Sequence, residues 1–396
     1  MRAAVFMCVV LLLPAAVGGA STAAPLFGLY EGTYSIEGFG VSPSGQKVIF
    51  LVGGGGPDGG QMRVMLREYA EDGAYVDREV CGGGKTEAEE GDRRVVRWEW
   101  VSWAGPFHWL DEERVVFSLW WRELEGNKKG LVLYDGAGLR TLVEGVAYTF
   151  SVYDNRLVAV YHKVDRPWIT ADIGEEGLAD LRDITDFDPS SQRLWDPVIV
   201  SDRIYMMRDA KYGKRYSLEL WEYDLGSRKL EQACKYDGVV LAKSAQGTLA
   251  YAVDSRQPWV HGTVVDWGLI PGLADLLVID GAGTQHWLTL PEGEANEEET
   301  IAIALGVFSP DGQRLLLAVD KGNERTELFI WRRYYVLDWV KGEWVEVKKP
   351  TVEGANPTYF YYWRPNGVWW WADIIRGEKK STSMALVKGF EEVDGQ

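Results

Sequence analysis

A short polar turn followed by an apolar run recurs along most of the chain, and this repeat constrains the fold more than any other feature. The clearest copy is Ser309-Pro310-Asp311-Gly312, which precedes the run Arg314–Val319. Two further copies are Ser42-Pro43-Ser44-Gly45 before Lys47–Val52, and Arg364-Pro365-Asn366-Gly367 before Val368–Ala372. A unit that returns every few tens of residues is typical of stacked β-units.

The apolar runs predict β-strands. They are short, rich in β-branched or aromatic residues and bounded by turn residues, whereas a helix needs about ten residues or more. Seven runs fit this description: Lys47–Val52, Arg114–Leu119, Arg156–Tyr161, Arg203–Met207, Thr248–Val253, Arg314–Val319 and Val368–Ile374. Their turns are spaced by roughly 43 to 68 residues, which brackets the repeat length of propeller blades.

Later strands of each unit alternate polar and apolar residues, as Lys229–Cys234 does, so one of their faces contacts water. Apolar inner strands and alternating outer strands are what a four-stranded propeller blade needs. The sequence therefore predicts an all-β fold, a β-propeller of seven four-stranded blades, with six blades as the alternative. The third unit is the weakest, with its later strands at Trp168–Ile173 and Leu181–Ile184.

The turns also carry a resemblance to a known family. Phe308-Ser309-Pro310-Asp311-Gly312 and Trp363-Arg364-Pro365-Asn366-Gly367 resemble the propeller repeat of TolB and of the N-terminal propellers of prolyl oligopeptidases. The resemblance implies a propeller over nearly the whole mature chain. It argues against peptidase activity, because peptidases of this kind carry their serine in a separate α/β-hydrolase domain, and no Gly-x-Ser-x-Gly elbow occurs here.

Residues 1–24 read as a signal peptide: one basic residue, an apolar core from Ala3 to Val17, then small residues. We expect residues 25–396 to form a single propeller domain that is exported to the periplasm or cell exterior. We also expect this domain to be a monomer and to contain no membrane-spanning segment. The segment Leu26–Ile36 is expected to pair with the last blade or to cap the ring. A net charge of −17 argues against nucleic acid as a partner.

Candidate binding residues lie at or before the innermost strands, where the blades converge on a central channel. They are Trp103, His108, Trp109, His162, Trp195 and Trp363. No catalytic residue and no metal ligand set is predicted, and no cofactor is expected. Ca²⁺ is an alternative at the acidic run Asp172–Asp188, although that run contains no Asp-x-Asp-x-Asp-Gly loop.

These features lead to one expected function and two alternatives. The expected function is a non-catalytic scaffold that binds a protein or peptide partner in the cell envelope. One alternative is a hydrolase or lyase with a metal in the central channel. The other is a cell-surface protein that binds carbohydrate through some of its 19 tryptophans.

Overall fold

The computed structural model of the protein describes residues 23–25, 34–54, 62–70, 74–82, 84–90, 93–123, 126–161, 168–175, 177–189, 192–212, 215–253, 275–291, 299–323, 328–349, 355–356, 361–364, 367–376, 381–388 and 391–392. Every regular element in these ranges is a β-strand, which confirms the predicted all-β class. None of these ranges holds a helix with the length and apolarity to cross a membrane. Residues 1–22 of the predicted leader lie outside the described residues.

The turns of the repeat owe their shape to local hydrogen bonds. Ser309 Oγ accepts a hydrogen bond from the backbone N–H of Arg314 at 2.9 Å, and the N–H of Gly312 donates to Ser309 O at 2.8 Å. Gly312 has a φ of 69°, a left-handed conformation that glycine adopts without steric cost. The same bonds form in two other turns, made by Ser42, Gly45 and Lys47 and by Ser244, Gly247 and Thr248. The repeat is thus a turn that launches a strand.

The described strands pair antiparallel into six sheets. The nine-stranded sheet contains β2 (Tyr34–Val41), β3 (Lys47–Gly54), β4 (Met62–Tyr69), β5 (Tyr75–Cys81), β6 (Gly84–Glu90), β7 (Arg93–Trp109), β8 (Val115–Glu123), β9 (Gly126–Tyr134) and β10 (Leu139–Glu144). Three sheets have four strands each: β11 (Val146–Tyr153), β12 (Arg156–Tyr161), β13 (Trp168–Ile173) and β14 (Leu178–Ile184); β15 (Leu194–Val200), β16 (Arg203–Tyr212), β17 (Arg215–Asp224) and β18 (Lys229–Gln232); β19 (Gly238–Lys243), β20 (Leu249–Val253), β21 (Asp275–Ile279) and β22 (Gln285–Thr289).

Two five-stranded sheets complete the described structure. One contains β23 (Glu299–Phe308), β24 (Arg314–Asn323), β25 (Leu328–Asp338), β26 (Glu343–Lys348) and β31 (Glu391–Glu392); the other contains β27 (Ala355–Asn356), β28 (Tyr361–Arg364), β29 (Gly367–Arg376), β30 (Ser381–Lys388) and β1 (Ala23–Pro25). In the nine-stranded sheet, one bridge pair, Met62 with Val101, joins the β2–β5 group to the β7–β10 group. Because this bridge fuses two groups, the number of sheets does not equal the number of blades, and the count of seven stays a prediction.

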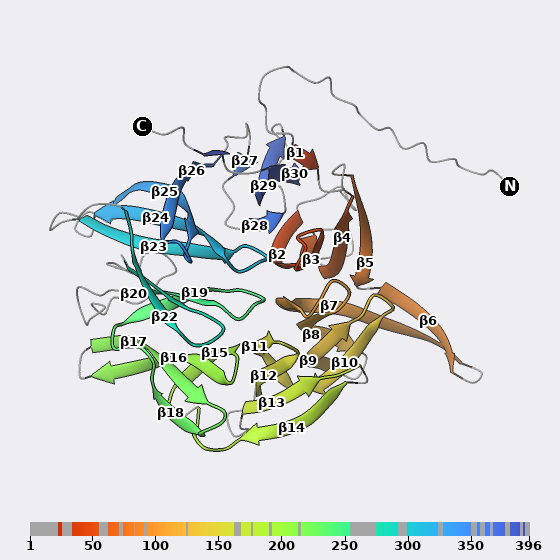
Figure 1. The fold of residues 1–396 in the computed structure, drawn as a ribbon. Coiled ribbons are helices and arrows are strands. Elements are labelled where there is room, and N and C mark those ends of the chain that lie inside the picture. Colours follow the sequence, from red (N-terminus) through yellow and green to blue (C-terminus); the bar gives the residue numbers. More distant parts are fainter. Residues whose placement is uncertain are drawn as a thin grey trace.

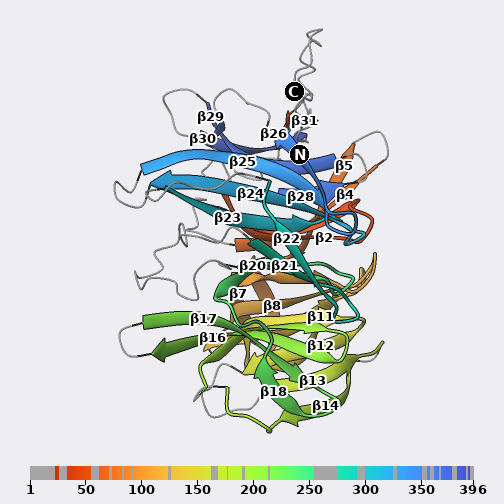
Figure 2. The same ribbon diagram turned by 60° about the vertical axis from the view of Figure 1, so that its left-hand side comes forward.

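The sheets are arranged around a common centre; the strands nearest to it are β2, β7, β11, β15, β19, β23 and β28 (Figure 1). In Figure 2 the β19–β22 sheet lies between the β15–β18 and β23–β26 sheets. Apolar side chains fill the space between neighbouring sheets; for example, Leu276 and Val278 of β21 share one buried cluster with Leu315 and Leu317 of β24. Each sheet therefore buries its faces on its neighbours, and the core is divided into layers between sheets.

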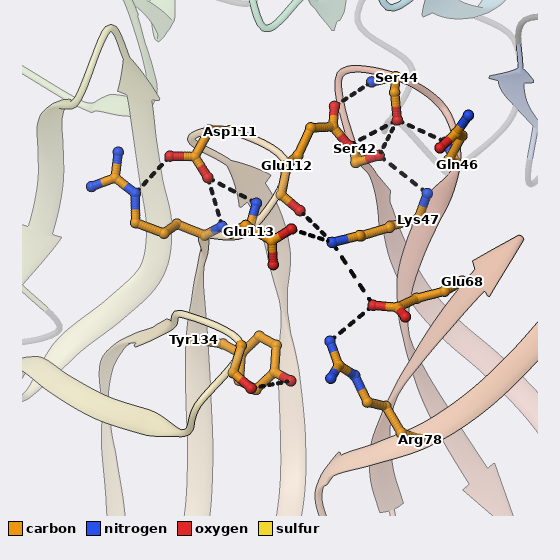
Figure 3. A network of polar contacts seen from close by, with 12 residues as sticks. Ser42, Ser44, Gln46, Lys47, Glu68, Arg78, Asp111, Glu112, Glu113 and Tyr134 are labelled. Atoms are coloured by element: carbon orange, nitrogen blue, oxygen red, sulfur yellow. Dashed lines mark hydrogen bonds and ion pairs between the residues drawn. The ribbon is translucent and has the colours of Figure 1, made fainter.

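Basic residues at the start of the second strands contact the turn of the following group; we call them the inter-sheet cations. Lys47 Nζ donates to Glu112 O at 2.9 Å and to Glu113 Oε1 at 2.7 Å (Figure 3). Arg156 forms an ion pair with Asp202 at 2.5 Å in the same way. These contacts join the polar ends of neighbouring sheets, where the apolar layers reach solvent.

Segments near both chain ends add strands to the outside of existing sheets. β1 pairs with β30, with Ala23 opposite Val387 and Pro25 opposite Ala385. β31 pairs with β26, with Glu392 opposite Val347. The strand that pairs with β30 therefore lies just before Leu26–Ile36, the segment that the sequence predicted to pair with the last blade or to cap the ring. Ile36 belongs to β2, which pairs with β3.

The two cysteines outside the predicted leader are free thiols in different sheets. Cys81 is half-buried at the end of β5, and Cys234 is buried after β18. Burial, with a smaller contribution from Glu79, raises the pKa of Cys81 to about 12. Both thiols are therefore poor nucleophiles in the folded protein.

Candidate functional site

The first strands of four neighbouring groups each place one polar side chain near the centre of the ring. These residues are His108 on β7, Ser151 on β11, Asp196 on β15 and Lys243 on β19, and we call them the central cluster. The strands that carry them are otherwise largely apolar, because they are enclosed by sheets on either side (Figure 1).

Lys243 on β19 and Ser151 on β11 together connect three of the first strands, β11, β15 and β19. Lys243 Nζ donates to Ser151 Oγ at 2.6 Å and to Val152 O at 2.9 Å. Ser151 is 1% exposed, and its Oγ also accepts the backbone N–H of Ile199 at 3.1 Å. Burial lowers the pKa of Lys243 to about 7, against the smaller raising effect of Asp196. The ammonium group is therefore held by β11, and it exchanges its proton near neutral pH.

His108 is half-buried as a residue, its Nε2 atom is buried, and its imidazole is neutral. Its ring packs edge-on against Phe150, with 4.8 Å between the ring centroids, and it hydrogen-bonds to the backbone of Phe150. Burial first, and the charge of Lys243 second, hold the pKa of His108 well below its ordinary value. Nε2 has no hydrogen-bond partner among the described residues. Since the other ring nitrogen makes the bond to the carbonyl of Phe150, Nε2 is a free acceptor.

Asp196 lies in an irregular part of β15. Trp195 pairs with Met207 and Val198 with Tyr205, so the residues between them have no partner in the ladder. Asp196 has a φ of 53°, which is uncommon for a residue other than glycine. The residue is exposed as a whole, yet the surrounding protein reduces the hydration of its carboxyl group and raises the pKa of that group, while Lys243 lowers it.

The central cluster combines a lysine of lowered pKa with a buried serine hydroxyl. A lysine with a pKa near 7 beside a serine hydroxyl matches the pairing of a nucleophile with a general base. However, Ser151 is buried and already accepts a backbone N–H, so a substrate cannot reach its Oγ. In the part of the chain that the structure describes, no three His, Cys, Asp or Glu side chains are placed to hold a metal ion.

The structure brings two of the sequence-predicted binding residues to the centre. His108 belongs to the central cluster, and Trp195 lies next to Asp196 with 42% of its surface exposed. Trp109 packs against the apolar layer between β3–β4 and β7–β9. Trp363 is buried, and its indole N–H donates to Val307 O at 2.9 Å. Trp103 pairs with Trp120 in the β7–β8 ladder.

His162 lies outside the described residues, so its placement adds nothing to the site. Three members of the central cluster, Ser151, Asp196 and Lys243, were missed by the sequence reasoning. Asp196 had a signal, because Pro197 interrupts an apolar strand, and proline inside a strand marks a bulge or an edge. Lys243 had a weaker one, as a single cation at the end of the run Val239–Ala242.

A second polar feature lies on the outside, between the β11–β14 and β15–β18 sheets. It is a groove of about 490 Å³, and four acidic residues of the predicted Ca²⁺ run line it: Asp172, Asp180, Asp183 and Asp186. Arginines interrupt this acidic surface; Arg228 binds both carboxylate oxygens of Asp186, at 2.6 and 2.9 Å. The groove is thus a mixed surface of ion pairs.

Comparison by sequence gives no relatives: no model of a protein family matches the chain, and no curated protein matches it. Comparison by structure gives many. The β-propeller domain of the Trilobed protease from Pyrococcus furiosus is 9% identical, with a TM-score of 0.53, and the match covers 92% of this chain and 96% of that one.

Two other solved structures are similar at lower scores. TolB from Acinetobacter baumannii is 12% identical, with a TM-score of 0.32 over 84% of this chain and 78% of that one. An oligogalacturonate lyase from Vibrio parahaemolyticus is 10% identical, with a TM-score of 0.46 over 88% of each chain. Identities this low show the fold alone. The chain has the β-propeller fold, which it shares with the propeller domain of the Trilobed protease.

Proposed function

We propose that the protein is an exported, non-catalytic β-propeller that binds a protein or peptide partner at the centre of the ring. The observation that carries this proposal is the contrast within the central cluster. Ser151 is buried and its Oγ already accepts two hydrogen bonds, whereas the residues Asp196 and Trp195 are exposed. Groups that are exposed and unused by the fold are available to a partner.

The position of these groups also supports binding. Propellers converge their first strands on one axis, so residues from several sheets can contact one ligand. His108, Asp196 and Lys243 come from three different groups of strands, and Lys243 acts electrostatically on each of the other two. A partner segment that enters along the axis would therefore contact a rigid set of groups that no single strand supplies.

Two experiments test the proposal. Purified protein is assayed for turnover of ester, peptide, glycoside and uronide substrates, and we expect none above the rate of a Lys243→Met variant. Elemental analysis accompanies the assay, because a stoichiometric transition metal or Ca²⁺ together with saturable turnover would favour the hydrolase or lyase alternative. Saturable turnover that disappears in Lys243→Met would refute the non-catalytic reading.

Export is tested separately. Residues 1–24 are fused to an alkaline phosphatase that lacks its own leader, and we expect phosphatase activity outside the cytoplasm. The control is the same fusion with Leu11, Leu12 and Leu13 replaced by lysine, which removes the apolar core that export requires. Equal activity from both fusions would contradict a signal peptide here.

A further inference from the structure

Asp196 is an acceptor that the fold leaves unused. It lies on the innermost strand of its sheet, in the irregular stretch between the Trp195 and Val198 pairs. Among the described residues it makes no hydrogen bond and no ion pair, although the residue is exposed and the surrounding protein disfavours the charged form of its carboxyl group. Lys243 is the one cation that influences its pKa, and the Nζ of Lys243 is bonded to Ser151 and Val152 instead.

A second unused acceptor lies in the same cluster. Nε2 of His108 is buried without a partner, and its imidazole is neutral, so it accepts rather than donates. Lys243 affects the pKa of both His108 and Asp196, which places the two acceptors within electrostatic reach of the same ammonium group. An unpaired polar atom inside a protein is costly, and a ligand, an ion or a water molecule is the usual explanation.

Lys243 is the cation of the cluster, but burial lowers its pKa to about 7, so that it loses its charge as the pH rises above neutral; the remaining groups at this place are of one kind. Trp195, next in the chain to Asp196, exposes 42% of its surface, and an indole face attracts cations. The whole chain carries a net charge of −17, which draws cations toward it. Carboxylate, imidazole acceptor and indole all favour a ligand that donates hydrogen bonds and carries positive charge.

We infer that Asp196 is the anchor for a basic group of the partner, a guanidinium or a primary ammonium, which enters the centre of the ring and binds the carboxylate. This inference rests on the proposed function, since it specifies what the partner presents. Arginine suits the site best, because its planar guanidinium pairs with both carboxylate oxygens and stacks on an indole. An ammonium group satisfies the same charge with weaker geometry.

The test uses defined peptides on the full-length mature protein, followed by isothermal titration calorimetry. The probes are acetyl-Gly-Arg-Gly-amide, its glutamine analogue without charge, and Gly-Gly-Gly-amide with a free amino terminus. We expect the arginine peptide to bind and the glutamine peptide not to bind at millimolar concentrations. Binding of Gly-Gly-Gly-amide as well would identify the amino terminus as a second acceptable source of the charge.

Variants assign the binding to one carboxylate. Asp196→Asn should lower the affinity for the arginine peptide by about 10- to 100-fold, the effect of losing a charge-assisted hydrogen bond. The matched control is Asp154→Asn, because Asp154 is also exposed and has a φ of 47°. This control should bind like the unaltered protein.

Three outcomes would overturn the inference: equal binding of the arginine and glutamine peptides, no effect of Asp196→Asn, or no binding by any probe. None of these touches the proposed function, which fails instead if the protein turns over a substrate. A partner that bound the protein equally well after Asp196→Asn would leave the scaffold role intact and place its contacts elsewhere.

Discussion

Replacing Lys243 with methionine should make the stability of the protein less dependent on pH. The pKa of Lys243 is about 7 in the folded protein and 10.5 in an unfolded chain, where the side chain is fully hydrated, a difference of about 3.5 pH units. At about 1.36 kcal/mol per unit, the charged form of Lys243 costs the folded state up to about 5 kcal/mol below pH 7. Methionine has a similar length and carries no charge.

The sign of the effect follows from proton binding. Between pH 7 and 10.5 the unfolded chain holds the proton of Lys243 and the folded protein does not, so stability rises with pH in this window. From pH 7 to pH 9 the unaltered protein should therefore gain about 2.3 kcal/mol in the free energy of unfolding relative to Lys243→Met, because Lys243 is still half protonated in the folded protein at pH 7. Below pH 7 the difference should become constant, because both states are then protonated.

Urea unfolding followed by tryptophan fluorescence at pH 6, 7, 8 and 9 measures this difference. The matched control is Lys341→Met: the exposed Lys341 pairs with Asp338, which raises its pKa, so it stays charged in both states throughout this range. The control should differ from the unaltered protein by the same amount at each pH. A difference between Lys243→Met and the unaltered protein that did not change with pH would refute the buried, near-neutral titration of Lys243.

Three further outcomes follow from the described contacts. Trp363→Phe removes a buried hydrogen bond and should lower the free energy of unfolding by about 1–2 kcal/mol, measured by urea unfolding; no loss would contradict that bond. Arg156→Ala breaks a largely exposed ion pair with Asp202, so the loss should stay below about 1 kcal/mol and shrink in high salt. Iodoacetamide at pH 8 should leave Cys81 and Cys234 unlabelled in the folded protein and label both in urea, as mass spectrometry would show; rapid labelling without urea would contradict their burial.

The strands could be predicted from the sequence because their signals are local. Each turn carries the serine, aspartate or glycine that fixes its own hydrogen bonds, and an apolar run follows it directly. The ends of the strands were less predictable. The apolar run Arg314–Val319 predicts a strand that ends at Val319, but β24 continues to Asn323. The strand extends past Val319 because Arg332 on β25 pairs with the buried Asp320 at 2.5 Å. A cross-strand partner is not visible in a single strand.

The central cluster could be predicted only in part, because it is assembled by packing rather than by spacing. His108 was found through its position before an inner strand. Ser151 was not, since a serine in an apolar strand is ordinary until the ammonium of Lys243, 92 residues later, is brought to its hydroxyl. Asp196 could not be singled out from the sequence. What distinguishes its carboxyl group is that it makes no hydrogen bond or ion pair with the described residues, and only the folded structure shows this.

The pairing of β1 with β30 links maturation of the chain to completion of a sheet. Ala23 and Ala24, which face Val387 and Leu386, are also the last residues of the predicted leader. A peptidase that cut after residue 24 would leave Pro25 as the sole remnant of this strand and expose the edge of β30 to other polypeptides. A cut before Ala23 would keep the strand, so the new amino terminus, read by Edman sequencing, reveals whether secretion leaves an open docking edge on the mature propeller.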